Sequence, residues 1–469
     1  MKHRLIPLLD ARSTYYALLA LNGLVVLTLW WSMRHDRGGD FKAYIGEAEG
    51  IMHGSFSMFW MLDHPIPDTF RTPGYPLYIA CILWLFGNWK ALKIVQLIMY
   101  VLIVHFVLRL IDQYDDRPRA KNCFLLLLLL SPNIPWYIPV MSPEIPVILC
   151  ISVLLVRDPL WKTQTWLGAI AAGLLYGFIF QCRPIFLFFP IARVVCDIAF
   201  ASQRVAWGKS AVVVLTYVAT LLPFGFWNLK EHGQFRLTPL EGGGGVMHMG
   251  YWSGRIPGHA EYHYWANTAG DEMMLFVPRA DVPRNVALFE REWDGIDSAL
   301  APFVSAQDSF MLFQTKRIEH AIPTYSTRYT LERERLLKGL TIAHIKEDPG
   351  YFTKYKIYSL FRLWIVGVPH DGFRTAGIIG KLSMLFAFAI TLGIFLIATV
   401  VLPMAYRRGL MSLRNTYPLL LYVFYFWLTH LPFVIQTRYT IPVRMILYVL
   451  IALAISAFIG DKTKEGTAA

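Results

Sequence analysis

Charged residues are scarce in this sequence. Asp, Glu, Lys and Arg make up 16% of the 469 residues, whereas the hydrophobic share is 55%. Soluble domains usually contain about 25% charged residues. A water-soluble fold cannot remove that much apolar surface from solvent, so the composition excludes an ordinary soluble protein and favours a membrane protein.

Motifs for nucleotide or metal chemistry are also lacking. No Gly-rich loop with a trailing Lys-Ser or Lys-Thr marks a nucleotide-binding site. His259 and His263 are four residues apart but lack the Glu of a metalloprotease helix, so we interpret them as surface histidines. The net charge of +12 is spread over short loops, which excludes nucleic acid as an expected partner. The cysteines lie in or beside apolar runs without metal or redox spacing: Cys81, Cys123, Cys150, Cys182 and Cys196.

Long apolar runs dominate the rest of the chain. Each is near the roughly 20 residues that cross a hydrocarbon core, and a helix satisfies its own backbone hydrogen bonds there. We therefore predict about ten transmembrane helices. They lie near residues 14–33, 91–111, 122–138, a segment ending at Arg157, 165–181, 184–200, 211–227, 380–404, 416–431 and 441–459.

The short loops between these runs predict the orientation. Lys and Arg gather in the loops near residues 117–121, 157–162, 204–209 and 407–414, and such loops stay in the cytoplasm. The two largest non-membrane segments, 34–90 and 228–356, then lie on the outer face. Residues 73–88 are short and interrupted by Pro and Gly, which predicts a helix in the outer interface rather than a span.

The first outer segment carries a distinctive pair of motifs. Asp40, Tyr44 and Glu47 share one side of a helix by their spacing, and Asp40 stands where a helix-capping carboxylate is ordinary. The segment closes with Arg71-Thr-Pro-Gly-Tyr75-Pro. Helix capping alone would explain Asp40. The combination of Asp40 and Tyr44 with the Arg-Thr-Pro-Gly-Tyr-Pro segment is a more specific signal of function.

This combination resembles the first outer loop of the GT-C glycosyltransferases, in particular bacterial relatives of protein O-mannosyltransferases and of the lipid A aminoarabinose transferase. The likeness runs from Asp40 to Pro442. The sequence departs from the family pattern at two positions. Phe41 stands where several members have a second acidic residue, and Glu144 stands where many have Asp. A bound divalent cation is therefore kept only as an alternative. Further similar segments follow in order: 142–144, 183–184, 228–250, 348–349 and 438–442.

The resemblance implies an all-α polytopic membrane protein of the GT-C type, with a juxtamembrane helical loop and a small extracytoplasmic domain. Residues 1–227, including outer loop 34–90, would form the catalytic transmembrane module, 228–356 the extracytoplasmic domain, and 357–469 the C-terminal helices. It implies transfer of a single sugar, with inversion, from a polyprenyl-phosphate donor to a glycan, lipid or protein acceptor. A multi-pass protein of a bacterial inner membrane, surrounded by membrane lipids and active on the periplasmic side, fits this reading.

Residue roles follow from that chemistry. A base must take a proton from the acceptor hydroxyl, and Asp40 is the candidate. Glu144 would support it, orient the acceptor or bind a cation; its ordinary alternative is a charge at a helix N-terminus. The leaving phosphate needs cations, and Arg grips phosphate through paired hydrogen bonds. Arg71, Arg183 and Arg438 are the candidates, with interfacial snorkelling or pairing to acidic neighbours as the alternative.

Five more residues are predicted to line the substrate path: Tyr44, Asp63, His64, Tyr75 and Tyr439. Asp63 and His64 are equally explained as solvated loop residues. Three other functions stay open. A flippase or transporter of lipid-linked saccharides would need charged or broken helices near the membrane midplane, a scaffold would use Asp40 only as a cap, and a ligase would transfer a whole glycan. No internal repeat supports a repeat-built transporter.

Overall fold

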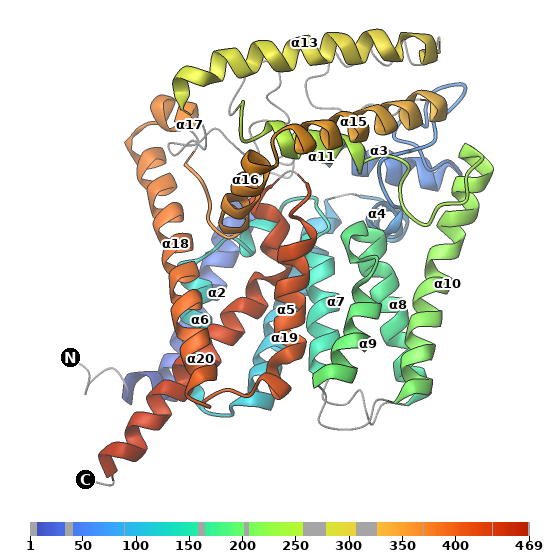
Figure 1. Cartoon of the computed structure of the whole chain (residues 1–469). Coiled ribbons are helices and arrows are strands. Elements are labelled where there is room, and N and C mark those ends of the chain that lie inside the picture. Colours follow the sequence, from blue (N-terminus) through green and yellow to red (C-terminus); the bar gives the residue numbers. More distant parts are fainter. Residues whose placement is uncertain are drawn as a thin grey trace.

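The computed structural model describes residues 7–32, 41–88, 90–157, 165–200, 206–256, 278–305, 326–368, 370–433 and 435–467. Within these ranges the regular structure is helical and includes no strand, which confirms the all-α prediction. Long helices stand side by side as a bundle, and further helices lie across one end of it (Figure 1). Asp40, His259 and His263 lie outside the described residues.

Five helices are long and apolar enough to cross a membrane, and they coincide with five of the predicted spans. They are α2 (Arg12–Ser32), α5 (Ala91–Tyr114), α10 (Trp207–His232), α18 (Ile378–Arg407) and α20 (Ile441–Thr467). Shorter helices in the same bundle stand where the other spans were predicted: α6 (Pro118–Leu130), α7 (Glu144–Arg157), α8 (Trp166–Cys182), α9 (Phe189–Phe200) and α19 (Leu413–Thr429). The total of ten spans stays a prediction.

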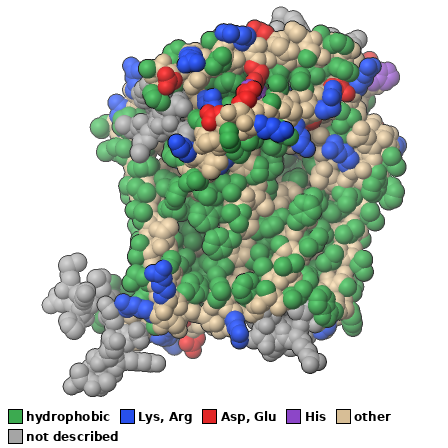
Figure 2. Space-filling model, viewed as in Figure 1, with side chains coloured by type: hydrophobic (Ala, Val, Ile, Leu, Met, Phe, Trp, Pro, Cys, Tyr) green, Lys and Arg blue, Asp and Glu red, His purple; other side chains and the backbone are tan. Residues whose placement is uncertain are grey.

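The flanks of the bundle expose large apolar side chains. Leu24, Leu215 and Ile379 have exposed fractions of 61%, 68% and 78%. In Figure 2 a band of hydrophobic side chains separates an upper layer, where acidic and basic side chains gather, from a lower edge that carries Lys and Arg. An apolar band of this extent needs a hydrocarbon solvent, so we treat the chain as a multi-pass membrane protein.

Small residues bring α8 and α10 close together. A Cβ on Gly173 would lie 2.6 Å from Thr216 Cβ and 2.7 Å from the Val213 carbonyl oxygen. Gly177, one turn further along α8, faces Thr220 in the same way. Membrane helices associate through such glycine contacts because lipid supplies no hydrophobic force between them.

Two predicted helix boundaries were wrong. The third span was expected over 122–138, but α6 ends at Leu130 and a 3-10 turn, η1 (Pro135–Tyr137), follows. Pro132 and Pro135 lack the N–H that a continuing helix needs. The seventh span was expected to end near 227, whereas α10 continues to His232 and stops at Gly233, whose φ of 69° is a left-handed helix cap.

The predicted interfacial helix is α4 (Gly74–Phe86), with 13 residues. At 1.5 Å per residue it is about 20 Å long, shorter than the roughly 30 Å hydrocarbon core. Its first turn is buried, whereas Trp84, Leu85 and Phe86 at its end are exposed. The helix is as short as α6 and α9 in the bundle, so its position in the outer interface stays a prediction.

The helices across the end of the bundle form what we call the polar layer: α3 (Phe41–Met52), α11 (Gly244–Trp252), α13 (Val282–Leu300), α15 (Thr327–Glu347) and α16 (Pro349–Arg362). A small hydrophobic core joins Ile66 of the first outer segment to Ile296, Leu300 and Tyr329 of the second. Thr69 also donates to Glu241 over 3.0 Å. The two predicted outer segments thus pack as one layer.

Candidate functional site

The candidate site lies where the bundle meets the polar layer. Three chain reversals meet at this end: η1 between α6 and α7, η3 (Pro184–Phe186) between α8 and α9, and η7 (Thr437–Thr440) between α19 and α20. Reversals between antiparallel helices expose backbone and polar side chains at a common level. This is where Glu144, Arg183 and Arg438 are found.

Arg183 and Glu144 form an ion pair between two of these reversals. Arg183 follows the end of α8, and Pro184 prevents the helix from continuing. Its Nη2 donates to Oε1 of Glu144, which opens α7 and is 1% exposed. Within the described part of the chain, Glu144 Oε2 and Arg183 Nε have no hydrogen-bond partner. Since buried polar atoms are normally paired, the ion pair retains capacity for a ligand.

The pKa of Tyr137, in η1, depends on several charged side chains near it. Burial raises the pKa of Tyr137 to about 12. The carboxylate of Glu144 acts in the same direction, and three guanidiniums oppose it: Arg438, Arg183 and Arg444. Three guanidiniums from separate segments, the end of α8, η7 and α20, thus act on one hydroxyl, together with the carboxylate that pairs with Arg183. Guanidiniums gathered at one position favour an anionic ligand.

Arg438 and its neighbours come from η7 and from the end of α19. The Arg438 guanidinium carbon lies 5.8 Å from the ring centroid of Tyr439. The Tyr439 ring stacks on His430, with centroids 4.8 Å apart and planes 21° apart. Below them, Arg444 of α20 donates to Thr440 Oγ1 over 3.0 Å and so holds η7.

Arg71 forms ion pairs with two carboxylates. Its Nη1 donates to Glu47 Oε1 over 3.0 Å and lies 3.8 Å from Asp68 Oδ2. Asp68 Oδ1 accepts the backbone N–H groups of Phe70 and Arg71. Burial raises the pKa of Glu47 well above its usual value, although Arg71 opposes this. The cluster therefore ties α3 to the Arg-Thr-Pro-Gly-Tyr-Pro segment.

Aromatic contacts connect this cluster to the Glu144 end. The Arg71 guanidinium lies 5.3 Å from the Tyr44 ring centroid, and Tyr44 packs edge-on against Tyr75 at 4.9 Å. Burial raises the pKa of Tyr75 well above its usual value, and Tyr78, Tyr44 and Glu144 add to it. Tyr44 thus contacts both Arg71 and Tyr75, and Tyr75 lies within electrostatic range of Glu144.

The structure therefore groups most of the predicted site residues. Glu144, Arg183 and Arg438 act electrostatically on Tyr137, and Tyr439 stacks on His430. Tyr44, Arg71 and Tyr75 contact one another in a second group. Asp63 and His64 are exposed in the loop after α3. The functional roles stay predictions. Glu47 was noticed only for its place on a helix face, and four neighbours were missed: Asp68, Tyr137, His430 and Arg444.

Metal binding finds no support among the described residues. No group of three or more His, Cys, Asp or Glu side chains in those ranges is placed to hold a metal ion. Asp40 lies outside those ranges, so the divalent cation stays an alternative.

A second polar cluster lies inside the polar layer. Glu292 of α13 contacts His248 Nε2 of α11 at 2.5 Å through Oε1, and His344 Nε2 of α15 through Oε2. Trp252 Nε1 donates to the same carboxylate over 2.9 Å. Burial opposes ionisation, but the bonds from His248 and His344 lower the pKa of Glu292 to about 2. The hydrogen bond to Glu292 raises the pKa of His344.

Lys356 of α16 joins the polar layer to the site. Its Nζ donates to the carbonyl oxygens of Gly250 in α11, over 3.1 Å, and Phe433 just after α19, over 3.0 Å. The side chain is 7% exposed, and burial lowers the pKa of Lys356 to about 7. One side chain thus connects three segments.

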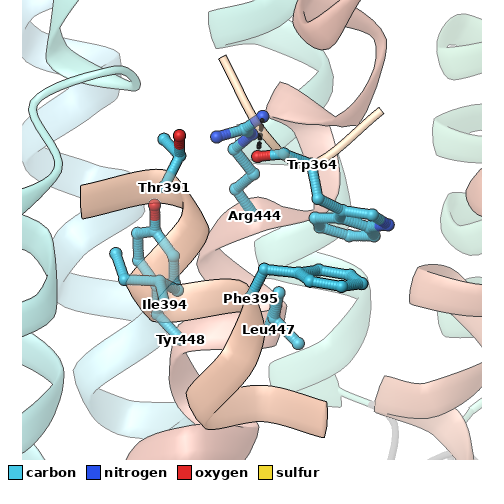
Figure 3. Close-up of a pocket in the computed structure, with 7 residues that line it drawn as sticks. All are labelled: Trp364, Thr391, Ile394, Phe395, Arg444, Leu447 and Tyr448. Atoms are coloured by element: carbon cyan, nitrogen blue, oxygen red, sulfur yellow. Dashed lines mark hydrogen bonds between the residues drawn. The ribbon is translucent and has the colours of Figure 1, made fainter. Parts of the chain in front are cut away.

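An apolar groove opens on the flank of the bundle. It has a volume of about 520 Å³ and runs between residues 130–136, at the end of α6, and residues 379–391 of α18. Thr391 also lines a cavity of about 10 Å³ with Arg444 and Tyr448, enough for about one water. Figure 3 shows the Arg444 guanidinium directed to the Trp364 carbonyl above this cavity.

Comparisons with known proteins give little further identification. No protein-family model matches the chain. No curated protein matches it. Among solved structures, the chain is similar to the oligosaccharyltransferase of Archaeoglobus fulgidus tethered with an acceptor peptide containing the NVT sequon. The identity is 14% and the TM-score 0.46, over 95% of this chain and 50% of that chain. The chain spans half the length of that protein chain.

Proposed function

We propose that the chain is a membrane glycosyltransferase that moves a single sugar from a polyprenyl-phosphate donor to an acceptor at the outer face, with inversion at the anomeric carbon. The observation that carries the proposal is the convergence of positive charge around Tyr137, at one end of an apolar bundle. A lipid phosphate is the anion that a membrane presents at this level. The resemblance of the motifs from Asp40 to Pro442 supports the same reading.

In this proposal Arg183 and Arg438 hold the donor phosphate. Negative charge grows on the leaving phosphate as its bond to the sugar breaks, so cations placed beforehand stabilise the transition state. Arg183 keeps an unpartnered Nε for this purpose. Arg71 is already paired with Glu47 and Asp68, so we assign it to positioning the first outer segment, with phosphate contact as its alternative role.

The apolar groove receives the donor's prenyl chain. Its walls include Leu130, Trp136, Leu382 and Phe386, which face the side of the bundle. Its inner wall at Thr391 adjoins Arg444, one of the guanidiniums that act on Tyr137. A lipid with its tail in the groove would therefore bring its phosphate toward the charged end.

The proposed reaction is a direct displacement. The acceptor hydroxyl oxygen attacks the anomeric carbon from the side opposite the phosphate, the bond from that carbon to the phosphate oxygen breaks, and the phosphate leaves with the electron pair. The hydroxyl proton passes to the carboxylate of Asp40, which lies one helical turn before Tyr44 in the sequence. Glu144 orients the acceptor or Arg183.

The test is sugar transfer by the full chain in lipid nanodiscs. Radiolabelled sugar on crude polyprenyl phosphate is the donor, and wild type is compared with Asp40→Asn at equal folded yield. Asp294→Asn is the matched control because Asp294 is exposed on α13. Transfer by wild type and the control but not by Asp40→Asn supports the proposal. Equal transfer by all three removes Asp40 from the mechanism, and transfer by none counts against glycosyl transfer.

A flippase is not favoured by the buried charges of the bundle. Arg193 and Asp197 of α9 pair over 2.8 Å, and Tyr417 donates to the same carboxylate oxygen over 2.5 Å. Four residues apart on one helix, the two ions compensate each other locally. We interpret this group as a structural contact between α9 and α19 rather than as part of a transport path.

A further inference from the structure

His430 is a buried polar residue of the site that the proposed reaction does not use. It follows the last residue of α19 and is 7% exposed. Its ring stacks on Tyr439 and lies 5.8 Å from the Phe426 ring. Tyr439 neighbours Arg438, and Arg183 acts electrostatically on His430 itself. The imidazole therefore stands among the groups proposed to hold the donor phosphate.

The hydrogen bonding of His430 determines its tautomer. Nδ1 lies 2.6 Å from the carbonyl oxygen of Phe426. A carbonyl oxygen only accepts hydrogen bonds, so Nδ1 carries the proton. A neutral imidazole has a single N–H, which leaves Nε2 as an acceptor. Among the described residues, no hydrogen bond reaches Nε2.

The surroundings keep this ring neutral. Burial lowers the pKa of His430 to about 4; the Phe426 carbonyl opposes the shift, and the positive charge of Arg183 adds to it. A group with so low a pKa is a weak proton acceptor at neutral pH, because a general base works best with a pKa near the working pH. His430 is therefore suited to accepting a hydrogen bond rather than a proton.

The donor chemistry limits what can satisfy that nitrogen. An acceptor nitrogen on a largely buried ring is satisfied by a donor, and an ionised phosphodiester offers only acceptor oxygens. The sugar is attached directly to the phosphate and carries hydroxyl groups that can donate. We propose that His430 Nε2 accepts a hydrogen bond from a hydroxyl of the transferred sugar, so that this residue contributes to sugar selection. This inference rests on the proposed function and deepens it.

Two substitutions separate this role from packing. His430→Phe keeps a ring that can stack on Tyr439 but removes Nε2. His430→Gln gives up part of the stacking but returns an acceptor oxygen at a comparable distance from the backbone. Loss of one hydrogen bond to a buried group changes binding by about 10- to 100-fold.

The experiment measures binding of two kinds of lipid to the full chain in nanodiscs. One is decaprenyl phosphate without sugar; the other is decaprenyl phosphate carrying mannose or arabinose. We expect His430→Phe to bind the bare lipid as wild type does and the preferred sugar lipid about 10- to 100-fold more weakly, with partial recovery in His430→Gln. Arg183→Lys should weaken both kinds of lipid.

The remaining outcomes overturn the inference in distinguishable ways. If His430→Phe weakens binding of both lipids equally, or of neither, His430 does not bind the sugar. The proposed function stands in that case. The same holds if wild type binds the sugar lipids no more tightly than the bare lipid. If wild type binds neither kind of lipid, the proposed function fails and this inference fails with it.

Discussion

At the scale of single residues, Arg183 combines an internal partner with an unused donor. Its Nη2 binds Glu144, yet its Nε lacks a partner in the described structure. Arg183→Lys keeps the charge but loses the fork that binds two oxygens at once. We expect sugar transfer to fall about 100-fold, the usual effect of removing one donor to a developing oxyanion.

The same transfer assay checks this prediction. Arg407→Lys is the control because Arg407 is an exposed arginine at the other end of the bundle, and it should transfer like wild type. Normal activity of Arg183→Lys would show that charge alone suffices at this position. A comparable loss in both variants would point to a general effect on the membrane-inserted fold.

Residue types were easier to predict from the sequence than residue partners. Motif order drew attention to Glu144 and Arg183, but nothing in a spacing of 39 residues predicts that they pair. Arg71 meets Glu47 across 24 residues, a partnership that depends on how α3 folds back on its loop. His430 lies near the end of the ninth expected span and belongs to no motif. Tertiary contact, rather than local pattern, gives these residues their surroundings.

At the scale of helices, the contact between α8 and α10 has little room. Gly173→Ala would place a methyl group 2.7 Å from the Val213 carbonyl oxygen, and backbone cannot rotate away. We expect a loss of about 1–3 kcal/mol in stability, seen as a lower thermal unfolding temperature in detergent. Gly393→Ala of α18 is the control, since a Cβ there meets nothing within 4 Å. Equal unfolding temperatures would mean that the helices can separate without cost.

The polar layer should respond to pH through His344. Its pKa is raised by Glu292, so its contribution is fully present below the ordinary pKa of about 6.5. The contribution is lost as pH rises through the folded-state pKa. The pKa of Glu292 is lowered from 4.5 to about 2, so its own contribution is fully present above about pH 4.5 and is lost only as pH falls toward 2. We therefore expect α11, α13 and α15 to hold together better at pH 6 than at pH 8.5.

Hydrogen exchange of the α13 and α15 amides, corrected for the intrinsic effect of pH, measures this difference. His344→Gln keeps a polar side chain but cannot be protonated in this range, so its protection should vary much less with pH. A wild-type layer whose corrected protection is the same at both pH values would contradict the assignment.

Helix type was predictable from the sequence, whereas helix ends were not. Apolar length identified α2, α5, α10, α18 and α20 directly. Pro132 and Pro135 fall inside the third expected span, 122–138, whereas α6 ends before both of them. Whether a proline kinks or ends a membrane helix depends on neighbours that resupply hydrogen bonds, and single-sequence patterns do not contain them.

At the scale of the whole molecule, the orientation in the membrane is the main prediction. The short basic loops predict that the polar layer lies on the outer side. In a variant with the five cysteines replaced by serine, Asp294→Cys on α13 should react with a membrane-impermeant maleimide in intact cells. Arg407→Cys should react only after the cells are permeabilised. The reverse pattern would place the site in the cytoplasm and exclude an outer-face reaction.

Lys356 connects the polar layer to the chain that follows α19 in the bundle. The ammonium group holds α11 and the chain just after α19 by one carbonyl each, and that second segment leads from His430 to Arg438. A displacement of α11 therefore pulls on the residues around the phosphate position. Such a coupling is reciprocal. If a ligand bound to the polar layer changes the affinity of the protein for lipid phosphate by some factor, lipid phosphate changes the affinity for that ligand by the same factor. Two substrates entering from opposite sides, one from water and one from the bilayer, would then influence each other's binding without contact.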